Sequence, residues 1–330
     1  MCGIVGYIGE KEAYPILING LKRLEYRGYD SAGIATLENS HLKITKKKGK
    51  VSFLEEAVEA DGKPTGTVGI GHTRWATHGP PSDVNSHPHD SETGDMVIIH
   101  NGIIENYGAL KEELTKRGHV FKSDTDTEVL IHLISNIRKN EDISLFDAVR
   151  IALNEVIGAY AIVVMDRNNP HQLIAAKKGS PMVVGLGENK EFYVASDATP
   201  IVEHTKNVIY LDDEEIAILD KEEGFTLMNI KNQQKTPYVQ ELEMKLEALE
   251  KGGYEHFMLK EIYEQPKSVR DSMRGRLRVN EGQVELGGIR DYISRFVNAD
   301  RIIIVACGTS WHAGLVGERS EEHTSELQSL

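Results

Sequence analysis

The chain has 330 residues, of which 38 are Lys or Arg and 51 are Asp or Glu, and its formal net charge is −13. This acidic balance argues against binding to nucleic acid or to anionic membrane surfaces, because both require a basic surface. No stretch approaches the ~18–20 apolar residues of a membrane span, and the N-terminus has no signal-peptide pattern. Two cysteines cannot build a disulfide framework and suit a reducing cytoplasm. We therefore expect a soluble, cytoplasmic protein of about two domains that binds neither nucleic acid nor membrane.

The first hundred residues predict several strands and one helix. Apolar residues recur at helical spacing from Ile16 to Leu24, and Gly28 ends this helix. A long polar loop runs from Thr77 to Asp95, and loops of that length are more often functional than accidental. Strands are expected at Cys2–Ile8, Gly33–Leu37, Thr67–His72 and Met96–His100.

The middle of the chain predicts three helices followed by six strands. Asp124 or Thr125 could cap the second of these helices. This order of strands, helices and strands indicates two antiparallel sheets with helices outside them, rather than a βαβ repeat. The helices are expected at Asn106–Arg117, Thr125–Ile137 and Ser144–Val156, and the strands at Tyr160–Met165, Gln172–Ala176, Met182–Leu186, Glu191–Ala195, Asn207–Tyr210 and Glu215–Leu219.

The composition becomes polar over Lys221–Gln240, where the first domain is expected to end. A charged linker helix is predicted over Glu241–Lys251, and a second helix over Tyr254–Glu264, ending before Pro266. We therefore divide the chain into a first domain (2–220), a linker with helices (221–284), the truncated start of a second domain (285–318) and a tail (319–330).

The second domain is expected to be incomplete. Arg301–Ala306 predicts a strongly apolar strand that runs into a turn at Cys307 and then a helix, which is how a parallel α/β unit begins. One strand and one helix cannot build a parallel sheet, so we expect residues from about 285 onward to be poorly packed. The polar residues Arg319–Leu330 (RSEEHTSELQSL) resemble a translated sequencing-adapter read, and we expect them to be non-native; the alternative is a natural flexible tail.

Cys2 is the first residue that indicates chemistry. Removal of Met1 would leave Cys2 as the N-terminal residue, which then carries both a thiol and an α-amine. An α-amine has a pKa of about 7.7–8.0, so it can act as a base near neutral pH, and the thiol is nucleophilic. The alternative is that Cys2 packs in its strand as a small apolar residue.

Five segments in this chain resemble, in the same order, those of the class II glutamine amidotransferases, the N-terminal-nucleophile glutaminases. They cover residues 2 to about 220 and imply a four-layer αββα fold for this part of the chain. The sequence LEYRGYD, from Leu24 to Asp30, is similar to the branch that uses fructose 6-phosphate as acceptor, the isomerizing aminotransferases. The five segments are MCGIVG at Met1, YRGYDSAG at Tyr26, HTRWATHG at His72, HNG at His100 and SDTDTE at Ser123.

The resemblance gives these segments roles in amide hydrolysis through a thioester. It assigns the nucleophile to Cys2 and the oxyanion site to Asn101 and Gly102, which can each offer an N–H group. It assigns the glutamine α-carboxylate to Arg74 and the ammonium to Asp126, in keeping with their charges. Taken singly, Asn-Gly predicts a hairpin turn, Arg74 a surface ion pair and Asp126 a helix cap.

The remaining motif residues are implied as walls of the glutamine site. Arg27, Gly28, Thr77 and His78 belong to that group, and the family loop from Arg74 to about Pro81 closes over glutamine. Trp75 resembles the gate of an ammonia path, although an aromatic residue is more often core packing.

Two further clusters have alternative interpretations. Five histidines within thirty residues resemble metal ligands, but no Cys or carboxylate cluster completes such a site, and no metal or organic cofactor is implied. They are His72, His78, His87, His89 and His100. The segment CGTSW superficially matches a thiol-protease signature, but the catalytic fourth position is Ser. The resemblance makes Cys307, Gly308, Thr309 and Ser310 part of a sugar-phosphate site at the start of a sugar isomerase domain.

The sequence therefore predicts that this chain hydrolyses glutamine but does not make glucosamine 6-phosphate, since the isomerase residues lie beyond it in the family. The full-length enzyme would bind glutamine and fructose 6-phosphate and form a homodimer. Two alternatives stay open: an amidotransferase with a different acceptor, and a non-catalytic glutamine-binding protein if Met1 is retained.

Overall fold

In a computed structural model, the described residues are 2–76, 79–141, 143–242, 253–273, 276–278, 282–284, 286 and 292–322. The chain divides into two compact units, Met1–Glu250 and Lys251–Leu330, which are described separately. No helix within the described ranges is long and apolar enough to cross a bilayer.

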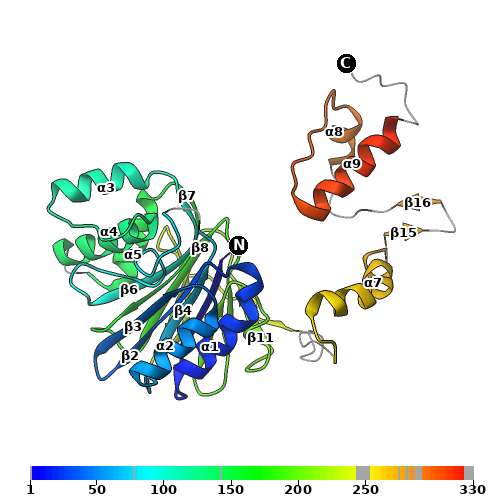
Figure 1. The fold of residues 1–330 in the computed structure, drawn as a ribbon. Helices are drawn as coiled ribbons and strands as arrows, with labels where there is room; N and C mark the ends of the chain where they lie inside the picture. Colours follow the sequence, from blue (N-terminus) through cyan, green and yellow to red (C-terminus); the bar gives the residue numbers. More distant parts are fainter. Residues whose placement is uncertain are drawn as a thin grey trace. The chain divides into compact units, whose positions relative to one another are not determined.

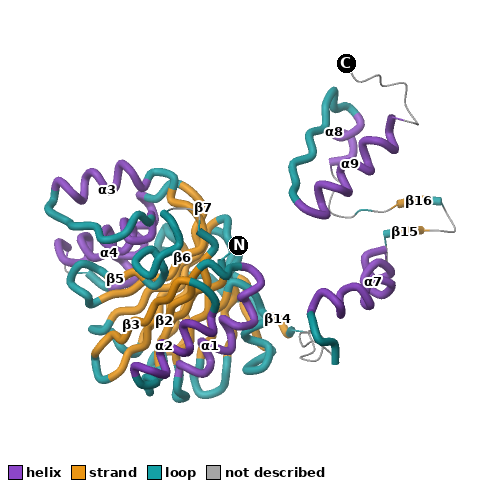
Figure 2. The backbone as a smooth tube through the Cα atoms, in the orientation of Figure 1, coloured by secondary structure: helices purple, strands orange, loops and turns teal. Residues whose placement is uncertain are grey.

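The first unit contains two antiparallel sheets (Figures 1 and 2). The eight-stranded sheet has the order β14 (Gln240–Glu241), β11 (Asn207–Tyr210), β9 (Val183–Leu186), β10 (Phe192–Ala195), β1 (Gly3–Ile8), β4 (Val68–Arg74), β2 (Ser31–Glu38) and β3 (His41–Lys48). The six-stranded sheet has the order β13 (Gly224–Asn229), β12 (Glu215–Asp220), β8 (Gln172–Lys178), β7 (Gly158–Asp166), β6 (Met96–Ile104) and β5 (His89–Asp90).

Side-chain alternation buries both faces of each sheet. In β1, Ile4 and Ile8 join the core between the two sheets, whereas Val5 and Tyr7 join the core under the helices. Strand β6 follows the same rule, with Val97 and Ile99 between the sheets and alternate residues toward the other helices. Consequently, even-numbered residues of β1 and odd-numbered residues of β6 face each other between the sheets.

Helices cover the outer face of each sheet, as Figure 1 shows. Helices α1 (Ala13–Leu24) and α2 (Val51–Asp61) pack on the eight-stranded sheet, and α3 (Tyr107–Lys116), α4 (Asp126–Glu141) and α5 (Leu145–Glu155) lie over the six-stranded sheet. The predicted arrangement of two antiparallel sheets flanked by helices is confirmed. The cap on α4 is Thr125, whose Oγ1 accepts a hydrogen bond from the Glu128 amide at 3.3 Å.

Several elements of the first unit were not predicted. Strand β3 is an edge strand that carries four lysines, and helix α2 buries only three side chains, so both have weak hydrophobic signals. Strands β13 and β14 pair with β12 and β11, so the sheets continue beyond residue 220, where the sequence indicated a domain boundary.

The second unit contains short elements: α7 (Phe257–Met273), β15 (Leu277–Arg278), β16 (Gln283–Val284), α8 (Ile293–Val297) and α9 (Gly308–Glu322). Helix α7 continues through Pro266, so the predicted end before this proline is wrong. The strand predicted over Arg301–Ala306 is also wrong: Ile302–Val305 are irregular and 60–91% exposed. A strand needs a hydrogen-bonded neighbour, and the described part of this unit pairs none with it. The linker helix was predicted over Glu241–Lys251. Its residues after Leu242 lie outside the described residues, which resume at Gly253.

Candidate active site

The register of the central strands brings the N-terminus next to Arg74. Strands β1 and β4 are antiparallel with Gly3 opposite Thr73, so Cys2 and Arg74 lie at the same end of the sheet. Side chains two residues apart in a strand point to the same face of the sheet. Cys2 and Arg74 therefore face the other sheet, as Ile4 and Ile70 do. Asn101 reaches the same space from β6, where it follows Val97 and Ile99 on the inner face. Alternation thus places these three side chains in one space between the sheets.

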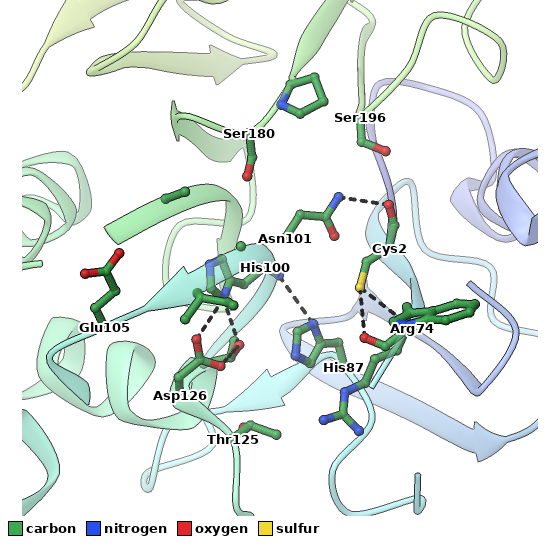
Figure 3. Close-up of a pocket in the computed structure, with 16 residues that line it drawn as sticks. Cys2, Arg74, His87, His100, Asn101, Glu105, Thr125, Asp126, Ser180 and Ser196 are labelled. Carbon is green, nitrogen blue, oxygen red and sulfur yellow. Dashed lines mark hydrogen bonds and ion pairs between the residues drawn. The ribbon is translucent and has the colours of Figure 1, made fainter. Parts of the chain in front are cut away.

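The Cys2 thiol lies against the backbone of Trp75, the first residue after β4. The Trp75 amide donates to Cys2 Sγ at 3.2 Å, and the thiol can donate to the Trp75 carbonyl oxygen at 3.5 Å (Figure 3). Burial raises the pKa of the Cys2 thiol, while the Trp75 N–H lowers it in part. A thiol held in this way is protonated at neutral pH and needs a base to become a nucleophile.

Asn101 and Gly102 lie within β6 and not in a hairpin turn. The Asn101 side-chain amide donates to the Cys2 carbonyl oxygen at 3.1 Å, which points its NH₂ group toward Cys2 (Figure 3). Gly102 has φ +136°, and a Cβ there would lie 2.0 Å from the Ala159 carbonyl oxygen, so only glycine fits. Both residues line the same cavity as the Cys2 thiol, and an Asn side-chain N–H together with a Gly backbone N–H is the donor set of an oxyanion hole.

A cavity of about 430 Å³ holds these groups together with one cation and one anion. Arg74 and Asp126 both line it and are 4% and 5% exposed. Asp126 is the first residue of α4, and its Oδ2 accepts a hydrogen bond from the Ile104 amide at 2.9 Å, which ties this helix to the end of β6. The cavity can therefore bind a small zwitterion next to the thiol.

The other expected site residues are placed as follows. Trp75 lines the cavity, is 45% exposed, and contacts Tyr29 edge-on with ring centroids 5.5 Å apart. Gly28 lies behind Arg74, where a Cβ would come within 2.9 Å of the Arg74 backbone. Thr77, His78 and the side chain of Arg27 lie outside the described residues. The segment from Cys307 to Ser310 is in the second unit, where it is exposed at the start of α9.

Sequence reasoning missed part of the cavity wall. Ser180 and Pro181 come from the connection before β9, and Ser196 follows β10. Ser196 Oγ also accepts the Ile4 amide at 3.1 Å, so it holds the start of β1 in place. These residues occupy ordinary loop positions, so no local pattern marks them.

The histidines of the polar loop pack into a buried cluster. The rings of His72 and His87 lie 4.2 Å apart between centroids, and His89 contacts His87 edge-on at 4.9 Å. Within the described ranges, no group of three or more His, Cys, Asp or Glu side chains is arranged to hold a metal ion.

Comparison with known proteins gives consistent results. Residues 60–261 match the family model of the glutamine amidotransferase domain. The chain is 59% identical over 321 residues to the glutamine–fructose-6-phosphate aminotransferase (isomerizing) of Chlorobaculum tepidum, and 57% identical over 319 residues to that of Bacteroides thetaiotaomicron. Each match covers 96% of this chain and 52% of the relative. The chain thus spans about half the length of these curated relatives.

Among solved structures, the chain is similar to the glutamine phosphoribosylpyrophosphate amidotransferase of B. subtilis. The TM-score is 0.60 at 28% identity, and the match covers 69% of this chain and 49% of that one. The two antiparallel sheets with helices outside them are the class II amidotransferase fold. The chain therefore belongs to the glutamine amidotransferase domain family.

Proposed function

We propose that this chain hydrolyses glutamine through a thioester on Cys2. The observation that carries this proposal is a single cavity lined by five of the expected site residues: Cys2, Asn101, Gly102, Arg74 and Asp126. This set contains a nucleophile, oxyanion donors and partners for both charged groups of a free amino acid.

In the proposed complex, Arg74 pairs with the glutamine α-carboxylate and Asp126 with the ammonium. Both groups line the cavity and carry the charges that complement those of a free amino acid. The family resemblance gives Arg27, Gly28, Thr77 and His78 further roles in glutamine binding. Trp75 lies where the loop that follows β4 begins.

The reaction needs a base beside the thiol. We assign this role to the α-amine of Cys2 after removal of Met1. The amine takes the thiol proton, Sγ bonds to the side-chain amide carbon of glutamine, and the oxygen becomes negative beside Asn101 and Gly102. The C–N bond then breaks, and the amine returns the proton to the leaving ammonia. Water hydrolyses the thioester to glutamate and restores the thiol.

The whole protein is proposed to be a glutamine–fructose-6-phosphate aminotransferase (isomerizing) that forms glucosamine 6-phosphate and acts as a homodimer. The relatives with 57–59% identity have this name, whereas the phosphoribosylpyrophosphate enzyme is 28% identical. Residues 285–318, including the segment from Cys307 to Ser310, would begin the sugar isomerase domain, and residues 319–330 would be foreign. The chain described here should then release ammonia without forming the amino sugar.

Intact mass spectrometry tests the glutaminase proposal. Purified chain is incubated with a diazoketone analogue of glutamine, and the expected product lacks Met1 and carries one adduct on Cys2. Cys2→Ala should take up no adduct, while Cys307→Ala, the matched control, should react like the parent chain. An unmodified Cys2 in a chain that has lost Met1 would overturn the mechanism.

The acceptor is tested separately on the full-length gene product. Incubation with glutamine and either fructose 6-phosphate or phosphoribosyl pyrophosphate should give an aminated product from fructose 6-phosphate alone. Glucosamine 6-phosphate from the 330-residue chain itself would contradict the assignment of its second unit as incomplete.

A further inference from the structure

His72 lies directly behind the Asn101 amide and has no role in the mechanism above. It lies on β4 and is 1% exposed. It comes two residues after Ile70, so its side chain points into the space between the sheets as that of Ile70 does. His72 Nε2 lies 2.9 Å from Asn101 Oδ1 and 3.0 Å from the His100 carbonyl oxygen.

These contacts determine which nitrogen of His72 carries the proton. A backbone carbonyl can only accept a hydrogen bond, so the Nε2 atom facing the His100 carbonyl must carry hydrogen. The amide atom of Asn101 that faces the same N–H must then be its oxygen. At the other end, Asn101 Nδ2 faces the Cys2 carbonyl oxygen, which again only accepts. Two carbonyls therefore select one of the two orientations of the Asn101 amide.

A second histidine is consistent with this assignment. His87 Nδ1 lies 3.3 Å from His72 Nε2 and accepts the His100 amide at 3.4 Å, so it acts as an acceptor toward both. Burial lowers the pKa of His72 to about 3 and that of His87 well below its usual value, so both rings are neutral at pH 7. The cluster is thus a chain of neutral rings with defined tautomers.

We propose that His72 is a positioning residue, which holds the Asn101 amide with its NH₂ group toward Cys2 through an Nε2–H···Oδ1 hydrogen bond. The inference rests on the proposed glutaminase function. If the amide rotated by half a turn, its oxygen would face the negative oxygen of the tetrahedral intermediate and repel it. The site would then lose one oxyanion donor, which costs about 10²–10³-fold in kcat in other enzymes.

The test compares His72→Leu with His72→Gln. Leucine removes the N–H donor, whereas glutamine can present an amide N–H at a similar reach. We expect His72→Leu to lower kcat for glutamine hydrolysis about 100-fold with little change in KM, because Arg74 and Asp126 are untouched. His72→Gln should recover most of this loss.

A merely structural role would not produce the accompanying pattern. The γ-aldehyde analogue of glutamine forms a tetrahedral adduct with the thiol, so its affinity should fall with kcat in His72→Leu. Iodoacetamide, whose reaction with Cys2 forms no oxyanion, should alkylate parent and variant at equal rates. Equal losses in the leucine and glutamine variants, or a rise in KM alone, would overturn the proposal.

A measurement on the parent chain covers the case in which His72→Leu does not fold. Nitrogen NMR of histidine-labelled protein, with the His72 signals identified from the His72→Gln spectrum, should show the Nε2–H tautomer. The Nδ1–H tautomer would overturn the inference. A parent chain that does not hydrolyse glutamine at all would instead refute the proposed function and leave the tautomer result to stand separately.

Discussion

Lowering the pH from 7 to 5 should destabilise the first unit, because buried neutral histidines take up protons when it unfolds. Burial lowers the pKa of His72 to about 3, and those of His87 and His89 well below their usual value. An unfolded histidine has a pKa of about 6.5, so below that pH the unfolded state binds more protons than the folded state. The contribution of these histidines to the free energy of unfolding is therefore fully present above about pH 6.5 and is lost as the pH falls toward their folded pKa values.

The size of the effect follows from these values. For a folded pKa of about 3, the free energy of unfolding falls by about 2 kcal/mol per histidine between pH 7 and pH 5. His87 and His89, whose pKa values burial also lowers, add to this loss, so it is a sizeable part of the total stability of about 5–15 kcal/mol of a typical domain. Unfolded carboxylates take up protons mainly below about pH 4.5, so this interval reports on the histidines.

Urea unfolding followed by far-UV circular dichroism at pH 7, 6 and 5 measures this loss. The variant His89→Gln removes one titrating ring and keeps a polar group near Thr125, to whose Oγ1 the His89 Nε2 is hydrogen-bonded at 3.1 Å. The loss of unfolding free energy between pH 7 and pH 5 should be smaller in this variant than in the parent chain, because one buried neutral ring is gone. A free energy of unfolding that is the same at pH 7 and pH 5 would refute the reasoning.

Two further substitutions test the site and the core. Gly102→Ala places a Cβ 2.0 Å from the Ala159 carbonyl oxygen at a residue with φ +136°, so glutaminase activity should be abolished. The control Gly108→Ala has open space at its Cβ and should keep full activity. An active Gly102→Ala variant would contradict the close contact. Arg138→Met leaves the fully buried Asp166 without its ion-pair partner. The free energy of unfolding, measured by urea titration, should fall by about 3 kcal/mol. A fall of less than about 1 kcal/mol would show that the pair is dispensable.

Much of the first unit could be predicted from hydrophobic periodicity. Strand β1 and helix α1 were predicted because their apolar residues repeat at the periods of a strand and a helix. Strand β3 and helix α2 were missed because their stability comes from packing on neighbours and not from a strong local pattern. Ile302–Val305 show the opposite case: an apolar run has strand propensity, but it forms a strand only when another strand pairs with it.

By itself, the sequence determined which chemical groups are available at the site: a second-position thiol, an Asn-Gly pair, a cation and an anion. Only the tertiary structure decided how they meet. The Asn101 amide contacts Cys2 across 99 residues of chain and His72 across 29, and two carbonyl groups determine its orientation. Such contacts depend on strand register and on the packing of two sheets, which no local spacing in the sequence encodes.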